Sequence, residues 1–559
     1  MTAPGPPGPF ARLLASLRAH AATWFGGGLA LALLMRAHQL YMAPVRWLNV
    51  DESYAGAIGL RILDPGGLPY VTGVSQRGPV MYWLYALALS LGGAFRVASI
   101  RYGALLFALA TVVLVLAALL VLSAARGAAL AALLLVWTMT AELAPADGLA
   151  WNGELIALPF VLGQVVLCAH ALSGRARRPL LELAAAGALM ALAVLSKQSF
   201  AGHGVVSLLW LALVLRPRRR LLVGVASFAG GALLVVGAVL APYVATGHLG
   251  EFWYYFVRWG REVYMAPVSL GDITAVVERR ILLRLPYVVL LVLGGVGAVL
   301  AARRAARRGD RAEAAALWAA LANALVAIPG ATFTGRDFGH YLLQTDVFVA
   351  LLVGLVAGSL LRERTLPHPR VVLAGALAAC VLAGVAIVVK QDAQLAALRR
   401  APWFDATVPA RDPISAWVRR NTAPSDRIFV WGFRADIHFN ARRWPASRYV
   451  YALYPSGVSP WYLEPPATLE RRVAPHSHQI LIDELEHTPA RWVLDAGDSL
   501  LGRFMVDYPV LAAYLREKYC FERVLEYTPV YGSLGPVSRI AVYRRRAGPE
   551  QPCVPVPLP

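Results

Sequence analysis

Long apolar runs constrain this chain more than any other feature of its sequence. Runs of mostly apolar residues, separated by short polar connections, occupy most of the first 390 positions: 22–42, 79–95, 101–123, 127–143, 154–173, 180–196, 200–215, 221–246, 285–302, 314–332, 341–361 and 370–390. A helix needs about 20 consecutive apolar residues to cross the hydrocarbon core of a bilayer. Because 58% of the 559 residues are hydrophobic and only 15% are charged, the sequence predicts a polytopic α-helical membrane protein.

Arginine-rich connections orient these runs. Positive charge is concentrated at Arg126 and at residues 175–178, 216–220, 303–308 and 362–370. Cytoplasmic loops carry the excess of Lys and Arg, and these connections are all cytoplasmic only if the run 79–95 lies along the outer membrane surface. That run is short, begins at Gly-Pro and ends at Gly-Gly, which favours an interfacial helix. We therefore expect about eleven transmembrane helices, a cytoplasmic N-terminal tail at 1–20 and an uncleaved first helix.

The net charge of +20 comes largely from the same arginine connections. It therefore describes membrane topology and contact with anionic lipid headgroups, and membrane lipids are expected partners. Nucleic acid is not an expected partner, because no basic module interleaved with aromatic residues occurs in the sequence.

The predicted topology places the residues suited to chemistry on one side of the membrane. Its outward segments are 43–100, 144–153, 196–199, 247–284, 333–340 and everything after about 391, whereas the cytoplasmic connections contain little besides Arg and small residues. We therefore expect a multi-pass protein of the cell membrane whose active site is extracytoplasmic. Its transmembrane catalytic domain would cover 21–390, with the interfacial helix in the outer loop 43–100.

The composition changes after residue 391. β-rich runs at 427–431, 491–495 and 539–543 alternate with helical patterns at 412–421, 469–486 and 509–519. This alternation predicts an extracytoplasmic α/β domain over 391–546, followed by a Pro-rich tail at 547–559. Cys520 and Cys553 lie in this part and pair if it faces an oxidising compartment; the alternative is two free thiols. Cys168 and Cys380 lie in apolar runs, where we expect them to be packing residues.

Three carboxylates on outward segments are candidate catalytic residues. Asp51 and Glu52 follow the first apolar run, where a carboxylate held near an apolar surface can take a proton from an attacking hydroxyl. The simpler interpretation is a helix cap, since the following Ser-Tyr-Ala-Gly-Ala could start a helix. Glu154 opens a later apolar run from the outer side, where it would orient an acceptor or simply stabilise a helix N-terminus. Together the three carboxylates could also hold a divalent cation; no other cofactor is indicated.

Several cations occupy outward positions that the positive-inside rule disfavours. Arg77 and Arg336 lie in outer loops, Lys197 lies in a turn between two apolar runs, and His340 follows Arg336 closely. Clamping a phosphate group is the functional interpretation, with Arg as a bidentate donor. Snorkelling of long side chains to the headgroups, and a packing role for the histidine, are the alternatives.

Aromatic residues accompany these candidates. They could line a groove for a sugar or a prenyl chain together with one arginine, and the candidates are Tyr54, Tyr82, Trp83, Tyr255, Arg258 and Tyr341. The densest aromatic run, 252–264, is equally typical of an interfacial belt helix.

The order of these motifs resembles a known family. The set consists of Asp51-Glu52-Ser-Tyr-Ala, Leu-Pro69-Tyr70, Arg77-Gly-Pro79-Val-Met-Tyr82-Trp83, Asn152-Gly-Glu154 with Leu158-Pro159, Lys197-Gln198, and Arg336 with His340-Tyr341. It resembles the membrane glycosyltransferases of the GT-C fold, particularly the family 39 type with protein O-mannosyltransferase-like and aminoarabinose-transferase-like enzymes. The resemblance covers roughly residues 20–390. Arg77-Gly-Pro departs from the family's basic-Pro-Pro form, and the C-terminal domain differs from the sugar-binding domains of protein mannosyltransferases.

The resemblance implies an inverting transfer of a hexose or pentose from a polyprenyl-phosphate carrier to an acceptor hydroxyl on the extracytoplasmic face. It implies that Asp51 is the general base and that Glu52 and Glu154 help to place the acceptor. Lys197 and Arg336, with Arg77 and His340, would bind the donor phosphate. A phosphate leaving group needs no general acid, so one base and a set of cations suffice, unlike the acid and base of a glycoside hydrolase. The acceptor, a glycan, a lipid or a protein, stays open.

Two interpretations from other classes also stay open. A transporter or flippase of lipid-linked sugars would predict paired charges near the membrane midplane and broken helices in two related halves, and the sequence has neither. A non-catalytic membrane scaffold, whose outer domain binds cell-envelope polymer, would leave the shared outer side of Asp51, Glu154 and Lys197 as a coincidence.

Overall fold

The computed structural model describes ten stretches of the chain and three isolated positions. The stretches are 50–122, 150–265, 268–282, 284–336, 338–363, 412–458, 472–500, 502–527, 538–548 and 553–555, and the isolated positions are 389, 393 and 396. The expected apolar runs 22–42 and 127–143, and 370–390 apart from position 389, lie outside the described residues.

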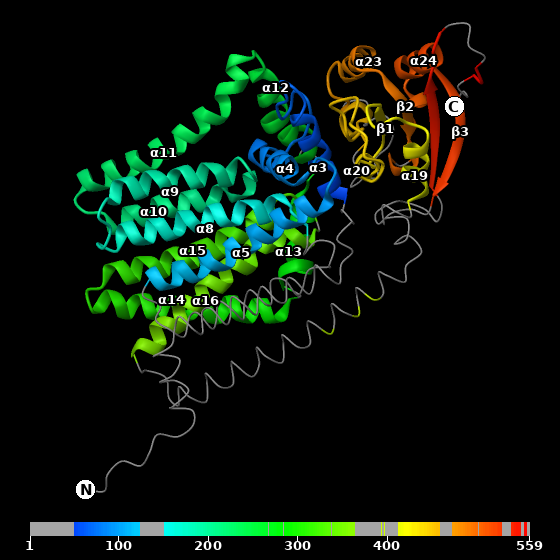
Figure 1. Cartoon of the computed structure of the whole chain (residues 1–559). Coiled ribbons are helices and arrows are strands. Elements are labelled where there is room, and N and C mark those ends of the chain that lie inside the picture. Colours follow the sequence, from blue (N-terminus) through cyan, green and yellow to red (C-terminus); the bar gives the residue numbers. More distant parts are fainter. Residues whose placement is uncertain are drawn as a thin grey trace, which may run out of the picture. The chain divides into compact units, whose positions relative to one another are not determined.

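The chain divides into two compact units, whose helices and strands are labelled in Figure 1. The first, which we call the helical unit, comprises Met1–Met42, Ala104–Pro242 and Pro267–Gln394. The second, which we call the sheet unit, comprises Ala43–Gly103, Tyr243–Ala266 and Leu395–Pro559.

The described part of the helical unit consists mainly of apolar helices. Its elements are α8 (Gly153–Leu172), α9 (Pro179–Val194), the 3₁₀ helix η1 (Gln198–Phe200), α10 (Ala201–Val214), α13 (Leu270–Val277), the π-helical η3 (Glu278–Leu282), α14 (Leu285–Arg307), α15 (Arg311–Thr332), the 3₁₀ helix η4 (Gly339–Leu342) and α16 (Leu343–Glu363). Two further helices, α5 (Val97–Val121) and α11 (Arg218–Ala245), have most of their residues here.

Six described segments are long and apolar enough to cross a membrane: Val97–Val121, Gly153–Leu172, Arg218–Ala245, Tyr287–Arg307, Arg311–Thr332 and Gly339–Ser359. The chain is therefore a membrane protein, as its apolar runs predict. The expected number of about eleven transmembrane helices stays a prediction. The run 79–95 does form a short helix, α4 (Pro79–Gly92), and its expected position along the membrane surface also stays a prediction.

Local capping residues mark the starts of several of these helices. Asn152 caps α8, and its side chain accepts a hydrogen bond from the Leu155 N–H at 3.0 Å. Asp310 caps α15 in the same way through Glu313. Pro179 occupies the first turn of α9, where its missing N–H costs nothing.

Small residues let two of the helices approach closely. A Cβ atom on Gly187 of α9 would lie 1.8 Å from the Phe228 carbonyl oxygen of α11, and one on Gly231 of α11 would lie 1.7 Å from the Ala184 carbonyl oxygen of α9. The two backbones are therefore in contact, which is how small residues pack helices in membranes. Further contacts join α8 to α9, α10 and α16, and α15 to α10, α14 and α16. Glu154 at the start of α8 lies near Lys197 in the α9–α10 connection and near His340 in η4, directly before α16.

The sheet unit combines two earlier segments, 43–103 and 243–266, with the C-terminal part of the chain. Its elements are α3 (Val50–Ile62), α4, α12 (Leu249–Trp253), the π-helical η2 (Tyr254–Met265), α19 (Pro413–Arg420), β1 (Arg427–Trp431), α20 (Asp436–Ala441), α21 (Leu453–Ser456), α23 (Ser477–His487), β2 (Ala490–Asp495), η6 (Gly497–Leu500), η7 (Met505–Asp507), α24 (Pro509–Lys518), β3 (Tyr519–Tyr527) and β4 (Ser538–Arg545).

Four strands form one sheet in the order β1-β2-β4-β3. β1 and β2 are parallel, whereas β4 runs antiparallel to both of its neighbours. Val430, Leu494 and Val542 are buried in register across three strands, and Trp417 of α19 packs edge-on against Trp492 of β2. The C-terminal part therefore folds as an α/β layer around its own apolar core.

The sequence prediction of this part is mostly confirmed. The runs 427–431, 491–495 and 539–543 are β1, β2 and β4, and the patterns 412–421 and 509–519 are α19 and α24. Within the pattern 469–486, helix α23 begins at Ser477, and residues 469–471 lie outside the described residues. Strand β3 was not predicted, because Glu522, Arg523 and Glu526 interrupt its apolar alternation.

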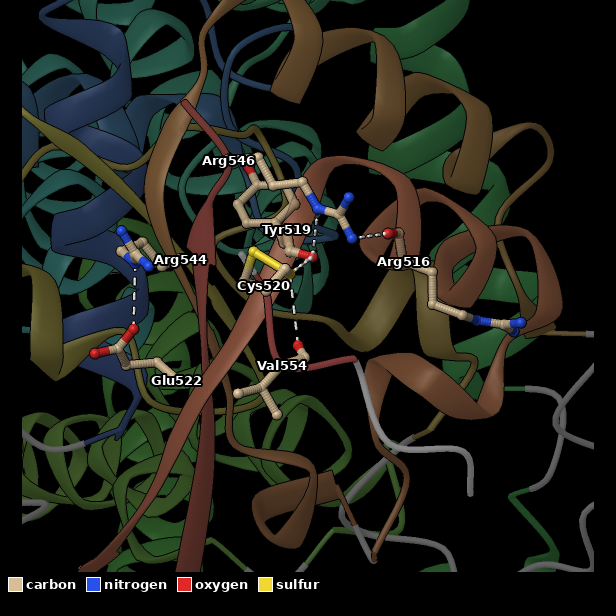
Figure 2. Close-up of a disulfide and its surroundings, with 8 residues drawn as sticks. Arg516, Tyr519, Cys520, Glu522, Arg544, Arg546 and Val554 are labelled. Carbon is tan, nitrogen blue, oxygen red and sulfur yellow. Dashed lines mark hydrogen bonds and ion pairs between the residues drawn. A yellow bond between two sulfur atoms is a disulfide. The ribbon is translucent and has the colours of Figure 1, made fainter. Parts of the chain in front are cut away.

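A disulfide joins Cys520 of β3 to Cys553 (Figure 2). Their Cα atoms are 5.2 Å apart, within the usual range for a bridge. The Phe521 N–H also donates to the Val554 carbonyl at 3.1 Å. Of the two alternatives left by the sequence, pairing is the one that the structure shows. Cys168, the free cysteine of the described part, is buried as expected.

Candidate active site

Helix α3 places the first two candidate carboxylates. Asp51 and Glu52 lie in its first turn, where acidic side chains complement the helix dipole. Consecutive residues of a helix project about 100° apart, so the two side chains meet different surroundings. Asp51 Oδ1 lies 2.7 Å from Arg77 Nη2, and the Asp51 side chain stays 25% exposed.

Glu52 is fully buried. Its Oε1 lies 2.6 Å from Arg101 Nη1 near the start of α5, and the side chains are 0% and 4% exposed. A buried carboxylate needs such a partner, and the pair joins α3 to α5. Sequence reasoning missed Arg101; a charged residue at the head of an otherwise apolar run is the signal that identifies it.

Hydroxyl groups hold the loop that carries Arg77. Tyr70 donates to the Arg77 carbonyl at 2.6 Å, Tyr54 donates to the Val74 carbonyl at 2.5 Å, and Tyr82 hydrogen-bonds to Ser75. Burial raises the pKa of Tyr54 to about 12, so its hydroxyl remains a donor. The predicted contact of Tyr54 and Tyr82 with a substrate stays a prediction, since both rings are buried.

The helical unit gathers the other predicted residues around Glu154. Glu154 lies in the first turn of α8, and its Oε1 is 2.8 Å from Lys197 Nζ. Its Oε2 is 4.0 Å from His340 Nε2 in η4. Lys197 Nζ also lies 4.5 Å from the centre of the Tyr341 ring, a cation–π contact.

A glycine makes room for this arrangement. A Cβ atom on Gly153 would lie only 3.3 Å from Lys197 Cδ, so a larger residue beside Glu154 would crowd the lysine. The Glu154 side chain is 2% exposed and that of Lys197 is 13% exposed. We call Glu154, Lys197, His340 and Tyr341 the lysine cluster.

Arg336 is buried close to helix α13. Gly335 before it adopts a positive φ of 61°, where a side chain would be strained. Hydrogen bonds from Ser269 hold the pKa of Asp272 below its usual range, and the charge of Arg336 adds to this effect. The predicted contact of Arg336 with a donor phosphate stays a prediction.

The remaining candidates lie in the sheet unit. The Tyr255 ring packs edge-on against Tyr454, with ring centres 5.2 Å apart, and is buried. Arg258 is exposed, and its Nε lies 2.8 Å from Glu262 Oε2. Trp83 is half-buried on α4. Their predicted place in a substrate groove stays a prediction.

The candidate site residues therefore occur in both units. The sheet unit holds the Asp51–Arg77 and Glu52–Arg101 pairs, and the helical unit holds the lysine cluster and Arg336. Within the described part of the chain, no group of three or more His, Cys, Asp or Glu side chains is arranged to hold a metal ion. A divalent cation held by Asp51, Glu52 and Glu154 stays a prediction.

Comparison with known proteins gives a likeness of structure. No family model and no curated protein matches the chain. The structure resembles ArnT from Cupriavidus metallidurans bound to undecaprenyl phosphate, with a TM-score of 0.52 and 15% identity over 95% of this chain and 100% of that one. The apo state of ArnT gives a TM-score of 0.52 at 14% identity, with the same coverage of both chains.

The apo oligosaccharyltransferase of Archaeoglobus fulgidus gives a TM-score of 0.49 and 15% identity over 95% of this chain and 75% of that one. At these identities, the likeness to ArnT concerns the fold alone. This chain has the GT-C fold.

Proposed function

We propose that this protein is an inverting glycosyltransferase that moves a sugar from a polyprenyl-phosphate carrier to an acceptor hydroxyl on the extracytoplasmic face. The observation that carries the proposal is the Asp51–Arg77 pair: a partly exposed carboxylate, oriented by a cation at 2.7 Å, at the start of a helix. The GT-C fold supports it, since ArnT, which shares that fold, has been solved with undecaprenyl phosphate.

The proposed reaction needs one base. The acceptor oxygen attacks the anomeric carbon, and its proton passes to Asp51. The bond between the anomeric carbon and the phosphate oxygen breaks, and the carrier phosphate leaves with the electron pair. The acceptor bond forms on the opposite face of the sugar, so the configuration inverts.

The lysine cluster would receive the departing phosphate. Lys197 has three N–H donors, and Glu154 at 2.8 Å orients the ammonium group without using all of them. Together with His340 and Arg336, it would balance the negative charge that develops on the leaving group. Arg77 is assigned here to the orientation of Asp51; direct contact of Arg77 with the phosphate is the alternative.

We propose the same topology as the sequence predicts. The catalytic membrane domain covers 21–390, the N-terminal tail 1–20 is cytoplasmic, and the α/β domain 391–546 with its tail 547–559 is extracytoplasmic in the cell membrane. The Cys520–Cys553 disulfide supports this orientation, because disulfides persist in oxidising compartments. The acceptor class, a glycan, a lipid or a protein, is left to experiment.

The function is tested with the purified full chain in lipid–detergent micelles. Radiolabelled polyprenyl-phosphate sugars are supplied one at a time with an envelope extract, and sugar transfer and released polyprenyl phosphate are both measured. We expect the wild type to consume one donor. Lys197→Met should slow this consumption by about 100-fold or more, the usual cost of removing one charge-stabilising donor.

Two further variants control for charge and folding. Arg261→Gln removes a cation whose side chain is 79% exposed and should transfer at the wild-type rate. Lys197→Met combined with Glu154→Gln removes both charges of the Lys197–Glu154 pair, so a slow rate in this double variant would not reflect a carboxylate left buried without its lysine. Wild-type rates in Lys197→Met would contradict the role of the lysine cluster. A wild type that consumes no donor would contradict the function and favour the transporter or the scaffold.

A further inference from the structure

A short segment of the C-terminal part contacts the helix that carries Asp51. The Tyr451 hydroxyl donates a hydrogen bond to the carbonyl of Val50, the residue directly before Asp51. The Tyr451 ring stacks on Tyr54 of the same helix, with ring centres 4.2 Å apart and planes 9° apart. Both rings are buried, so Tyr451 holds the first turn of α3 through its ring and its hydroxyl.

The same segment also contacts the loop that carries Arg77. The Tyr454 hydroxyl donates to Gln76 Oε1 at 2.9 Å, and Gln76 directly precedes Arg77. The Val74 N–H donates to the Arg448 carbonyl at 3.3 Å. Two tyrosines three positions apart therefore hold the two sides of the Asp51–Arg77 pair.

The segment is itself anchored in the C-terminal α/β part. Arg448 Nε and the Ser447 hydroxyl lie 2.7 Å from the two carboxylate oxygens of Glu484 in α23. The Tyr454 ring packs against Trp259 of η2, with ring centres 4.7 Å apart. Such a fixed frame can transmit its position to the residues that it contacts.

We propose that Tyr451 and Tyr454 are positioning residues that set the geometry of the Asp51–Arg77 pair. The inference rests on the proposed function. It gives the C-terminal domain the role of holding the catalytic base, Asp51, in position. The physical reason is that a shift of the Val50 carbonyl tilts the first turn of α3 and moves the Asp51 carboxylate with it. Misplacing a reacting group by about 1 Å can cost about 100-fold in rate.

The decisive variant is Tyr451→Phe, which keeps the stacked ring and removes only the hydroxyl. Tyr519→Phe is the matched control, because the buried Tyr519 hydroxyl likewise donates to a backbone carbonyl, that of Ala490 at 3.2 Å. Both variants lose one phenol-to-carbonyl bond, so their melting temperatures should fall equally. We expect kcat to fall about 10–100-fold in Tyr451→Phe, with KM for the donor unchanged, and to stay within about twofold in Tyr519→Phe.

A double variant separates positioning from general damage. If Tyr451 acts through Asp51, adding Tyr451→Phe to Asp51→Asn should not slow the residual reaction further. A wild-type kcat in Tyr451→Phe would overturn the proposal. An equal loss in the Asp51→Asn background, or an equal loss in Tyr519→Phe, would overturn it as well.

Hydrogen exchange provides a measurement that does not depend on activity. In Tyr451→Phe, amides of α3 and of the loop 74–77 should exchange faster than in the wild type and in Tyr519→Phe. Unchanged exchange there would overturn the positioning role. If the wild type transfers no sugar but Tyr451→Phe still exchanges faster, the proposed function is contradicted and the positioning role is not.

Discussion

Asp51 and Glu52 are neighbours in one helical turn, and each has an arginine partner at nearly the same distance. The Asp51–Arg77 contact measures 2.7 Å and the Glu52–Arg101 contact 2.6 Å. The difference is access to solvent: the Asp51 side chain is 25% exposed, whereas Glu52 is fully buried. A base must reach its substrate, so access distinguishes the two carboxylates better than charge pairing does.

The comparison also separates two kinds of energetic contribution. A partly exposed ion pair contributes about 0–1 kcal/mol to stability, because water screens it. A buried pair is costly to break, because removal of one partner leaves an uncompensated charge in the interior. Asp51 is therefore expected to matter for turnover, and Glu52 for folding.

Asp51→Asn gives the largest expected effect and tests the catalytic side of the comparison. The variant keeps the size of the side chain and removes the base, so kcat should fall by about 10²–10⁴-fold. The melting temperature should change little, since the lost pair is partly exposed. Transfer assays and thermal unfolding in detergent measure the two quantities. Wild-type transfer by this variant would remove Asp51 from the mechanism.

Glu52→Gln tests the structural side. It should lower the free energy of unfolding by about 3–5 kcal/mol, because the buried Arg101 guanidinium loses the carboxylate charge that lies 2.6 Å away. Adding Arg101→Met to Glu52→Gln should restore much of the lost stability. Arg101→Met alone should not stabilise the protein. Expression of folded protein and thermal unfolding report the effect. If Glu52→Gln instead keeps its melting temperature and loses turnover, Glu52 is catalytic, as the family resemblance implies, and the comparison is reversed.

Asp495, at the end of β2, extends the comparison to a buried carboxylate that has hydrogen bonds but no cation in the described structure. Burial raises its pKa well above the usual range, although the Met505 N–H donates to its Oδ2 at 2.7 Å. Well below pH 4 the Asp495 carboxyl is protonated in both the folded and the unfolded state, so its ionisation does not change the free energy of unfolding. As the pH rises, the unfolded state ionises first, and stability is lost until the folded pKa is passed.

Asp495→Asn should remove this pH dependence. We expect the variant to melt higher than the wild type at pH 8 by about 2–4 °C, the shift that ~1 kcal/mol produces in a domain of this size. The difference should shrink as the pH falls toward 4. Melting curves of the full chain across pH measure it, and a variant that is less stable than the wild type at pH 8 would show that Asp495 is ionised in the folded state.

The sequence predicts much of this architecture because the signals are local. Apolar length predicts the membrane helices, and the run 79–95, which begins at Gly-Pro, forms a helix that starts at Pro79. Asp51 was singled out by its place after an apolar run, and the structure pairs it with Arg77, another predicted residue. The catalytic roles of both residues stay predictions.

Partners distant in the sequence were not predictable in the same way. Glu154 and Lys197 were assigned separate tasks, and only the structure shows that they form an ion pair. Arg101 was not among the predicted site residues, although its side chain forms an ion pair with Glu52. Strand β3 was not predicted from its charged sequence, yet it pairs with β4 from Tyr519 to Tyr527 with one register shift between Phe521 and Arg523.

What the sequence determined by itself was the set of elements: membrane helices, a carboxylate-bearing segment near residue 51 and a C-terminal α/β part. These follow from hydrophobic length and periodicity and from hydrogen bonds spanning about four residues, so a short window of sequence contains the information. The tertiary structure alone decided that Glu52 is buried while Asp51 stays accessible, and that Tyr451 holds the carbonyl of Val50, 401 positions away. Packing decides such contacts, because which side chains meet depends on how whole elements fit together.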